Sequence, residues 1–142
     1  MNLNFDMIGP ALALGLSAIG SSIGCGIAGM ASHAVMSRVE EGHGKFIGMA
    51  AAPSSQSIYG FILMLLMSKA IAAGTLAPIS AIGIGAAAGT AIMFSAIWQG
   101  KVAATGIQAS AKNPAIFGKC FAAVGIIESF ALFALVFSLL LL

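Results

Sequence analysis

Charged side chains are scarce in this sequence. Of its 142 residues only 7% are Asp, Glu, Lys or Arg, while 60% are hydrophobic. An ordinary soluble domain carries about a quarter charged residues, so this chain lacks the polar surface that water requires. The mean hydropathy of +1.07 agrees with this. Soluble protein classes are thereby excluded, and the composition predicts a protein embedded in a lipid bilayer.

Several kinds of functional site are missing too. The net charge is only +2, and no cluster of Lys or Arg with interleaved aromatic residues appears, which argues against nucleic-acid binding. Cys25 and Cys120 lie in apolar segments without CxxC or metal-ligand spacing, so we interpret both as packing residues. No Ser/His/Asp or Cys/His arrangement and no phosphate-binding loop is present. We therefore expect no enzymatic active site in this chain.

The few charges and prolines divide the chain into four apolar segments. They run from about residues 7 to 35, 46 to 68, 78 to 110 and 120 to 142. Each reaches the roughly 20 residues that cross a bilayer, and in lipid such a run must be helical to satisfy its backbone. We therefore predict an all-α membrane protein of four transmembrane helices. No Lys or Arg precedes the first segment, so we expect a permanent helix in a complete chain rather than a cleaved signal peptide.

The two halves of the chain resemble each other. An offset of 72 positions places Ser55-Gln56-Ser57-Ile58 on Ile127-Glu128-Ser129-Phe130, and each half has a segment rich in small residues followed by a bulkier one. This pattern predicts two tandem hairpins in the same orientation, residues 1–72 and 73–142, of which the second carries the carboxylate.

Basic residues gather at the turns within the two hairpins. Arg38 and Lys45 flank the first turn and Lys112 and Lys119 the second, whereas Lys69 lies at the opposite side. The positive-inside rule predicts that both hairpin loops are cytoplasmic and that both termini lie outside.

Small residues recur every four positions in the first and third segments. The two stripes and their small neighbours are Gly20, Gly24, Ala28 and Ser32 beside Ser22 and Gly26, and Ala81, Gly85 and Gly89 beside Gly83, Ala87 and Ala91. Such stripes let helix backbones approach closely. We interpret them as contacts with further copies of the chain, on the crowded inside of a ring; ordinary contacts within one chain are the alternative.

Glu128 is the only charged residue between Cys120 and Leu142. It lies nine residues after Lys119 and fourteen before the C-terminus, or about 14 and 21 Å along a helix, which is near the middle of a bilayer. An ionised carboxylate costs at least about 2.5 kcal/mol there, so such a residue indicates a functional site. A structural buried acid is the alternative.

Other polar residues are expected at the same depth. Gln56 lies about midway between Lys45 and Lys69, and its helix face also holds Ala52, Ser55 and Tyr59. Pro53 cannot donate to the carbonyl of Met49, so carbonyls of this turn are free to face a ligand. With Gln99 from the third segment, these residues would form a cage of oxygen atoms around Glu128. Hard cations take such ligands, whereas a proton needs only the carboxylate.

Two runs of sequence resemble a known family. They are QGKVAATGIQ from Gln99 to Gln108, followed by AKNP from Ala111 to Pro114 and then Glu128, and PSSQSIYGF from Pro53 to Phe61. Together they resemble the proteolipid (K, or c) subunit of V/A-type rotary ATPases over essentially the whole chain. The resemblance implies a homo-oligomeric rotor ring in a membrane, typically that of a prokaryotic cell, with the first and third helices inside. It also implies a membrane stator subunit with half-channels and a basic residue, and central-stalk subunits at the cytoplasmic loops.

The resemblance also implies an ion and its ligands. In sodium-binding members, Na⁺ is ligated by the residues at five positions, which correspond here to the Ala52 carbonyl, Ser55, Gln56, Gln99 and Glu128. The residue at the position of Tyr59 supports the carboxylate. Ser55 stands where threonine is common, and Ala52 is smaller than the usual side chain. Gln56 fills a position that holds a second carboxylate in single-hairpin relatives, which leaves one ion for four helices.

Three functions therefore remain open from the sequence. The first is a rotor subunit that carries Na⁺ on Glu128, coupled to ATP hydrolysis or synthesis. The second is the same rotor subunit with H⁺ as its cargo and without any other cofactor. The third is a small four-helix cation or multidrug exporter, although such proteins place their glutamate on the first helix, where this chain has none.

Overall fold

The computed structural model describes residues 5–142, so residues 1–4 of the predicted first hairpin lie outside the described part. The elements in chain order are α1 (Ile8–Met36), α2 (His43–Ala51), the 3₁₀ turn η1 (Ala52–Ser54), α3 (Ser55–Ala72), α4 (Pro78–Lys112), the 3₁₀ turn η2 (Pro114–Ile116) and α5 (Phe117–Leu139). Pro78 occupies the first turn of α4, as predicted, because its fixed φ and missing N–H suit that position.

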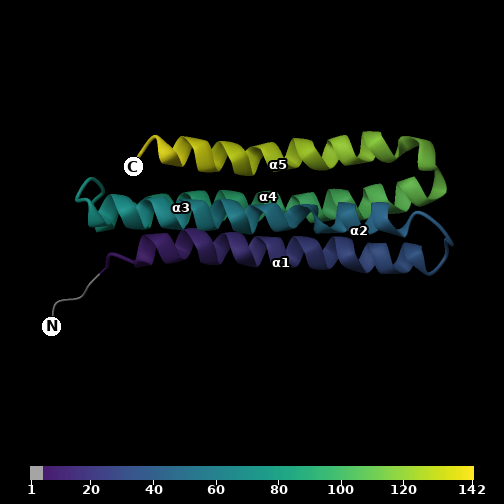
Figure 1. Ribbon diagram of the computed structural model, residues 1–142, viewed down its shortest axis with the longest axis horizontal. Coiled ribbons are helices and arrows are strands. Elements are labelled where there is room, and N and C mark those ends of the chain that lie inside the picture. The colour runs from purple at the N-terminus through teal and green to yellow at the C-terminus, as the bar shows by residue number, and fades with distance from the viewer. Residues whose placement is uncertain (1–4) are drawn as a thin grey trace.

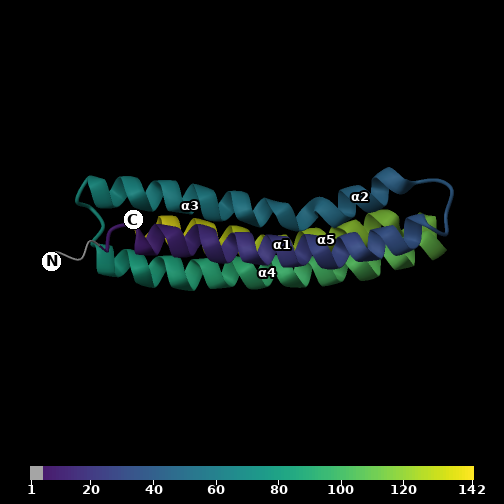
Figure 2. The same cartoon turned by 90° about the horizontal axis from the view of Figure 1, so that it is seen from below.

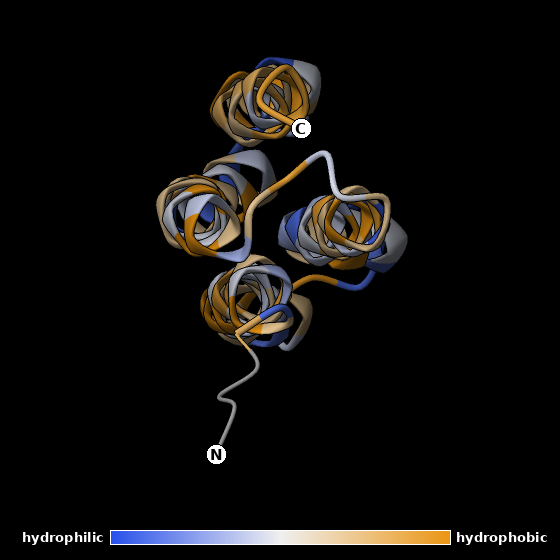
Figure 3. Cartoon of the chain, turned by 90° about the vertical axis from the view of Figure 1, so that its left-hand side faces the viewer, coloured by the Kyte–Doolittle hydropathy of each residue, from blue (hydrophilic) through white to orange (hydrophobic). Residues whose placement is uncertain are grey.

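Four stretches of helix are long and apolar enough to cross a membrane. They are Ile8–Met36, His43–Ala72, Pro78–Lys112 and Pro114–Leu139, the second of which joins α2, η1 and α3. Large apolar side chains such as Phe61, Phe133 and Phe137 point out of the bundle, and the hydrophobic colouring of its outer faces is visible end-on (Figure 3). The prediction of an all-α membrane protein with four spans is confirmed.

The two hairpins run in the same direction. Figure 1 shows the α1–α2 and α4–α5 connections at one end of the bundle, and the α3–α4 turn and both termini at the other. Gly74 has a φ of 75° in the α3–α4 turn, a conformation that glycine adopts without strain. We call the end with the two hairpin connections the loop end. Its cytoplasmic location stays a prediction.

Close packing of α1 on α4 holds the two hairpins together. At Gly20 an added Cβ would lie 2.5 Å from the Met93 backbone, and Gly24, Gly85 and Gly100 are as crowded. The buried glycines of both small-residue stripes therefore pack against the facing helix of the same chain. The interpretation that the stripes meet other copies was wrong for these glycines. At two of their exposed neighbours, Gly26 and Gly83, an added Cβ would meet nothing within 4 Å.

The second span changes its helical form at Pro53. The chain passes from α2 through one 3₁₀ turn into α3, and Figure 2 shows the two helices following each other along one side of the bundle. The N–H of Ala52 bonds the carbonyl of Met49, a bond that Pro53 cannot make. Pro53 is buried against Gly24, so the change of helical form occurs at a point where α1 packs against the second span.

Substitution of Gly24 by Ala tests this packing. The new Cβ would lie 2.8 Å from Pro53 Cβ and closer still to the Ala96 carbonyl oxygen. We expect Gly24→Ala to destabilise the chain by about 1–3 kcal/mol, measured by thermal unfolding in detergent. The matched control is Gly48→Ala, where nothing lies within 4 Å of the new atom. Equal melting temperatures for the two variants would contradict the assigned contact.

Candidate functional site

The Glu128 carboxyl group is bound from α3 by two hydroxyl groups. Ser55 Oγ donates to Glu128 Oε1 over 2.6 Å, and Tyr59 Oη donates to the same oxygen over 2.7 Å. Ser55 and Tyr59 are four residues apart, so they stand one turn above the other on the same face of α3. This pair joins the second hairpin to the first at one carboxyl oxygen.

Two fully buried glutamines lie behind the carboxyl group. Gln56 Nε2 donates to Gln99 Oε1 over 2.8 Å, and Gln99 Nε2 donates to the Val124 carbonyl over 3.1 Å. Gln99 Nε2 also lies 3.4 Å from Glu128 Oε2. Polar groups without water must be paired to avoid a cost of about 1–3 kcal/mol each, and these bonds pair both amides. The glutamines therefore link α3, α4 and α5 at one depth.

Oxygen atoms gather around the hydroxyl of Ser55. Ser55 Oγ lies 3.1 Å from the Ala52 carbonyl, 3.2 Å from Gln56 Oε1 and 2.6 Å from Glu128 Oε1. A serine hydroxyl has one proton, so it satisfies one of these three acceptors at a time. The Ala52 carbonyl belongs to the 3₁₀ turn at Pro53, which brings it beside the side chains of the next turn. Four oxygens thus face one small volume.

Three hydrogen bonds converge on the Glu128 carboxyl group within residues 5–142. They join it to Ser55, Tyr59 and Gln99. No group of three or more His, Cys, Asp or Glu among the described residues could hold a metal ion. A cation bound here would therefore depend on neutral oxygens and a single carboxylate.

The structure brings together all six residues predicted for the site. Ala52, Ser55, Gln56, Tyr59, Gln99 and Glu128 lie within one network of contacts. Gln99 differs in detail, since its amide nitrogen faces Glu128 while its oxygen accepts from Gln56. Their role as ion ligands stays a prediction.

Two further contributors were missed. Buried Ser95 donates from Oγ to the Ile127 carbonyl over 2.8 Å, and the Val124 carbonyl accepts from Gln99. Ser95 precedes Gln99 by four residues on α4, and Val124 precedes Glu128 by four on α5. Helical spacing alone therefore places both on the faces that carry the site, and this signal could have found them.

The chain itself covers the site unevenly. Ser55, Tyr59 and Glu128 are half-buried, whereas Gln56 and Gln99 have no exposed surface. The carboxyl group and the two hydroxyl groups therefore lie nearer the surface of the chain than the two glutamines.

Comparison with known proteins agrees with this arrangement. The family model that describes the C subunit of ATP synthase matches the chain twice, at residues 8–67 and 82–141. The chain belongs to the family of ATP synthase C subunits. The double match confirms the tandem duplication predicted from the offset of 72 positions, with one family unit in each hairpin.

One relative extends the comparison. The A-type ATP synthase subunit K of Methanocaldococcus jannaschii is 35% identical over 95% of this chain. The chain spans 60% of the length of that relative. This family membership favours a rotor subunit and argues against a small exporter, since the family model matches both hairpins, including α5 with Glu128.

Removal of the Gln99 amide tests the network. Gln99→Leu would leave Gln56 Nε2 without its partner in a buried position, so we expect a loss of about 1–3 kcal/mol in unfolding free energy. The control Gln108→Leu changes the same residue type on the exposed face of the same helix. Denaturant titration should separate the two variants, and equal stabilities would contradict the network.

Proposed function

We propose that this chain is a rotor-ring subunit of a V/A-type rotary ATPase that carries one Na⁺ per chain on Glu128. The observation that supports this most is the group of four oxygens, from Ala52, Ser55, Gln56 and Glu128, that face one small volume. Na⁺ is the cargo of this cycle. Its binding neutralises the carboxylate, and this neutralisation makes the half-buried position in lipid tolerable.

Sodium suits the chemistry of these donors. Hard cations prefer carboxylate, carbonyl, hydroxyl and amide oxygens, and a single carboxylate matches the charge of one monovalent ion. Gln99 as a further oxygen ligand stays a prediction, because its Oε1 accepts from Gln56 in this structure. With that oxygen engaged, Gln99 orients Gln56 and donates to Glu128.

The transport cycle follows from the change in charge. The neutral, ion-loaded site can face lipid, whereas the empty site is an anion that must face water or a cation. A basic residue of the stator would therefore displace the ion and compensate Glu128 until the next ion arrives. Each charge moved across 100 mV is worth about 2.3 kcal/mol, so one carboxylate per four helices means few ions per ATP. Such a ratio suits pumping against a steep gradient.

Copies of the chain would meet through the small residues that remain exposed. On α1 these include Gly15, Ser22 and Gly26, and on α4 they include Gly83 and Ala87. An added Cβ at Gly15, Gly26 or Gly83 meets nothing within 4 Å. These exposed small residues lie on α1 and α4, the two helices that pack closely within the chain. If the same exposed surfaces met between successive copies, they would build a ring with α1 and α4 on its inner side.

The loop end would meet the rest of the complex. With the basic residues at the hairpin turns, the positive-inside rule assigns this end to the cytoplasm and both termini to the outside of the cell membrane. Central-stalk subunits would contact these loops, and the stator would contact the outer faces of α3 and α5.

Protection of Glu128 from carbodiimide labelling tests the ion. Added Na⁺ should slow the labelling of Glu128 at fixed pH, because a bound ion occupies the carboxylate. For Ser55→Ala we expect the Na⁺ concentration of half-protection to rise about tenfold, since a ligand and a charge-assisted hydrogen bond are both lost. Labelling rates followed by mass spectrometry give both values.

The matched control for this test is Ser129→Ala. Ser129 stands next to Glu128, but its hydroxyl bonds the Ile126 carbonyl of its own helix over 2.7 Å. Its half-protection should equal that of the unmodified chain. If Na⁺ protects neither protein and transport proceeds at an unchanged rate in sodium-free buffer, the cargo is H⁺.

Neutralisation of the carboxylate tests the carrier role itself. Glu128→Gln should abolish ion transport coupled to ATP in reconstituted vesicles while the complex still assembles. Asp6→Asn removes another carboxyl group, near the opposite end of α1 from the loops, and should leave the flux unchanged. If ATP-coupled transport persisted in Glu128→Gln, the carrier role would be contradicted, and Glu128 would have only a structural role.

A further inference from the structure

Ser95 occupies a buried position on α4, facing the helix that carries Glu128. Its side chain is 6% exposed, and its hydroxyl donates from Oγ to the Ile127 carbonyl of α5 over 2.8 Å. Other buried serines, such as Ser17 and Ser110, bond the carbonyl four residues earlier in their own helix. Ser95 thus makes a contact between two helices, although serine in a helix can also bond its own backbone.

The carbonyl that Ser95 contacts belongs to the peptide unit that ends at Glu128. The carbonyl carbon of Ile127 is bonded to the backbone nitrogen of Glu128, so a group that holds this carbonyl also holds the point from which the glutamate side chain extends. In an α-helix the same carbonyl accepts from the N–H four residues later, and its second lone pair is free for Ser95. The Ser95 bond is therefore additional to the helix and restrains the position of α5.

Gln99 holds α5 at a second point nearby. Its Nε2 donates to the Val124 carbonyl over 3.1 Å, and Val124 precedes Ile127 by three residues on α5. Ser95 and Gln99 are four residues apart on α4, so their side chains lie on one face of that helix. A helix held at one point can turn about it, whereas two such contacts restrain both its rotation and its depth.

Glu128 needs this restraint because its carboxyl group must meet partners on a third helix. Ser55 and Tyr59 of α3 donate to its Oε1 over 2.6 and 2.7 Å. Hydrogen bonds weaken steeply as their geometry departs from the optimum. A functional group must be held within about 0.5 Å and about 10–20° of its working geometry. A small rotation of α5 is therefore enough to move the carboxyl group away from α3.

We propose that Ser95 is a positioning residue for the ion-carrying carboxylate of Glu128. It acts through the Ile127–Glu128 peptide unit, which it holds so that the carboxylate meets Ser55 and Tyr59. Loss of its hydroxyl should weaken ion binding and leave the fold intact, because the Ile127 carbonyl keeps its bond within α5. The inference rests on the proposed function, since it takes Glu128 as the ion carrier.

Protection of Glu128 from carbodiimide labelling measures the effect on binding. We expect Ser95→Ala to raise the Na⁺ concentration of half-protection about tenfold, as the loss of groups that orient metal ligands does. Ser95→Thr keeps the hydroxyl group and should restore the half-protection of the unmodified chain. A cavity of about 530 Å³ that Ser95 lines with Phe94 and Trp98 leaves room for the added methyl group.

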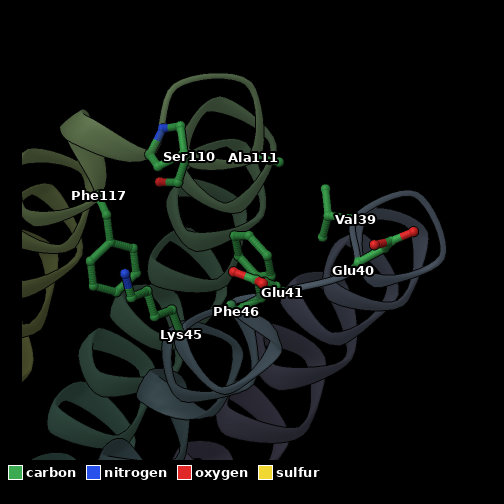
Figure 4. A pocket seen from close by; sticks show the side chains of 10 residues that line it. Val39, Glu40, Glu41, Lys45, Phe46, Ser110, Ala111 and Phe117 are labelled. Atoms are coloured by element: carbon green, nitrogen blue, oxygen red, sulfur yellow. The ribbon is translucent and has the colours of Figure 1, made fainter.

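Ser110→Ala is the matched control. Ser110 is a buried serine of the same helix, but its hydroxyl bonds the Gly106 carbonyl of α4 over 2.6 Å. It lies at the loop end, where Figure 4 shows it with Phe46 and Phe117 among the residues that line a cavity. It stands fifteen residues after Ser95, or about 22 Å along the helix. Its loss removes no hydrogen bond to α5, so half-protection should equal that of the unmodified chain.

Nuclear magnetic resonance reads the contact itself. Ile127–Glu128 is the only Ile–Glu step in the sequence, so ¹³C in isoleucine carbonyls and ¹⁵N in glutamate select this single peptide unit. A hydrogen bond deshields a carbonyl carbon. The Ile127 signal, recorded without Na⁺, should therefore move to lower chemical shift in Ser95→Ala and stay in place in Ser95→Thr and Ser110→Ala.

The two measurements separate this inference from the proposed function. Unchanged half-protection in Ser95→Ala, an equal loss in Ser95→Thr, or an Ile127 signal that Ser95→Ala leaves in place would each overturn the role of Ser95. If Na⁺ does not protect even the unmodified chain, the sodium proposal has failed instead. The Ile127 signal then decides alone whether Ser95 holds the peptide unit of Glu128.

Discussion

One constraint governs this structure, namely that a carboxylate near the middle of a bilayer must be compensated. An ionised Glu128 costs at least about 2.5 kcal/mol in that position. The two hydroxyl groups of α3 and the amide of Gln99 offset part of this cost, and each belongs to a different helix from Glu128. The carboxylate therefore fixes the relative depth of α3, α4 and α5, and in the proposed cycle a bound ion would complete its compensation.

The rest of the bundle keeps these donors in place. Glycines of α1 and α4 allow the two hairpins to approach within backbone contact, and the same contact presses Gly24 against Pro53. Pro53 in turn imposes the 3₁₀ turn that brings the Ala52 carbonyl beside Ser55. Small residues in the apolar core and the polar site are thus parts of one arrangement. Interiors packed this closely shift little, so the Ala52 carbonyl and the side chains around Glu128 are held in fixed positions.

Much of the fold and of the site followed from the sequence. Helix number, the like orientation of the hairpins and the free carbonyls near Pro53 follow from hydropathy, the internal repeat and local backbone chemistry, which a single sequence contains. Glu128, Gln56 and Gln99 could be placed at one depth because helix rise converts residue number into distance. The partner of the small-residue stripes could not be predicted, since Gly24 has the same chemistry whether it meets α4 of its own chain or another copy. The amide orientation of Gln99 depends likewise on neighbours from two other helices.

The central claim is that each chain holds one exchangeable ion on Glu128, and equilibrium binding of radioactive sodium to the purified oligomer tests it most directly. The account predicts saturable binding of one Na⁺ per chain that protons displace as the pH falls, and no binding to Glu128→Gln. Saturable sodium binding of the same stoichiometry in Glu128→Gln would contradict it.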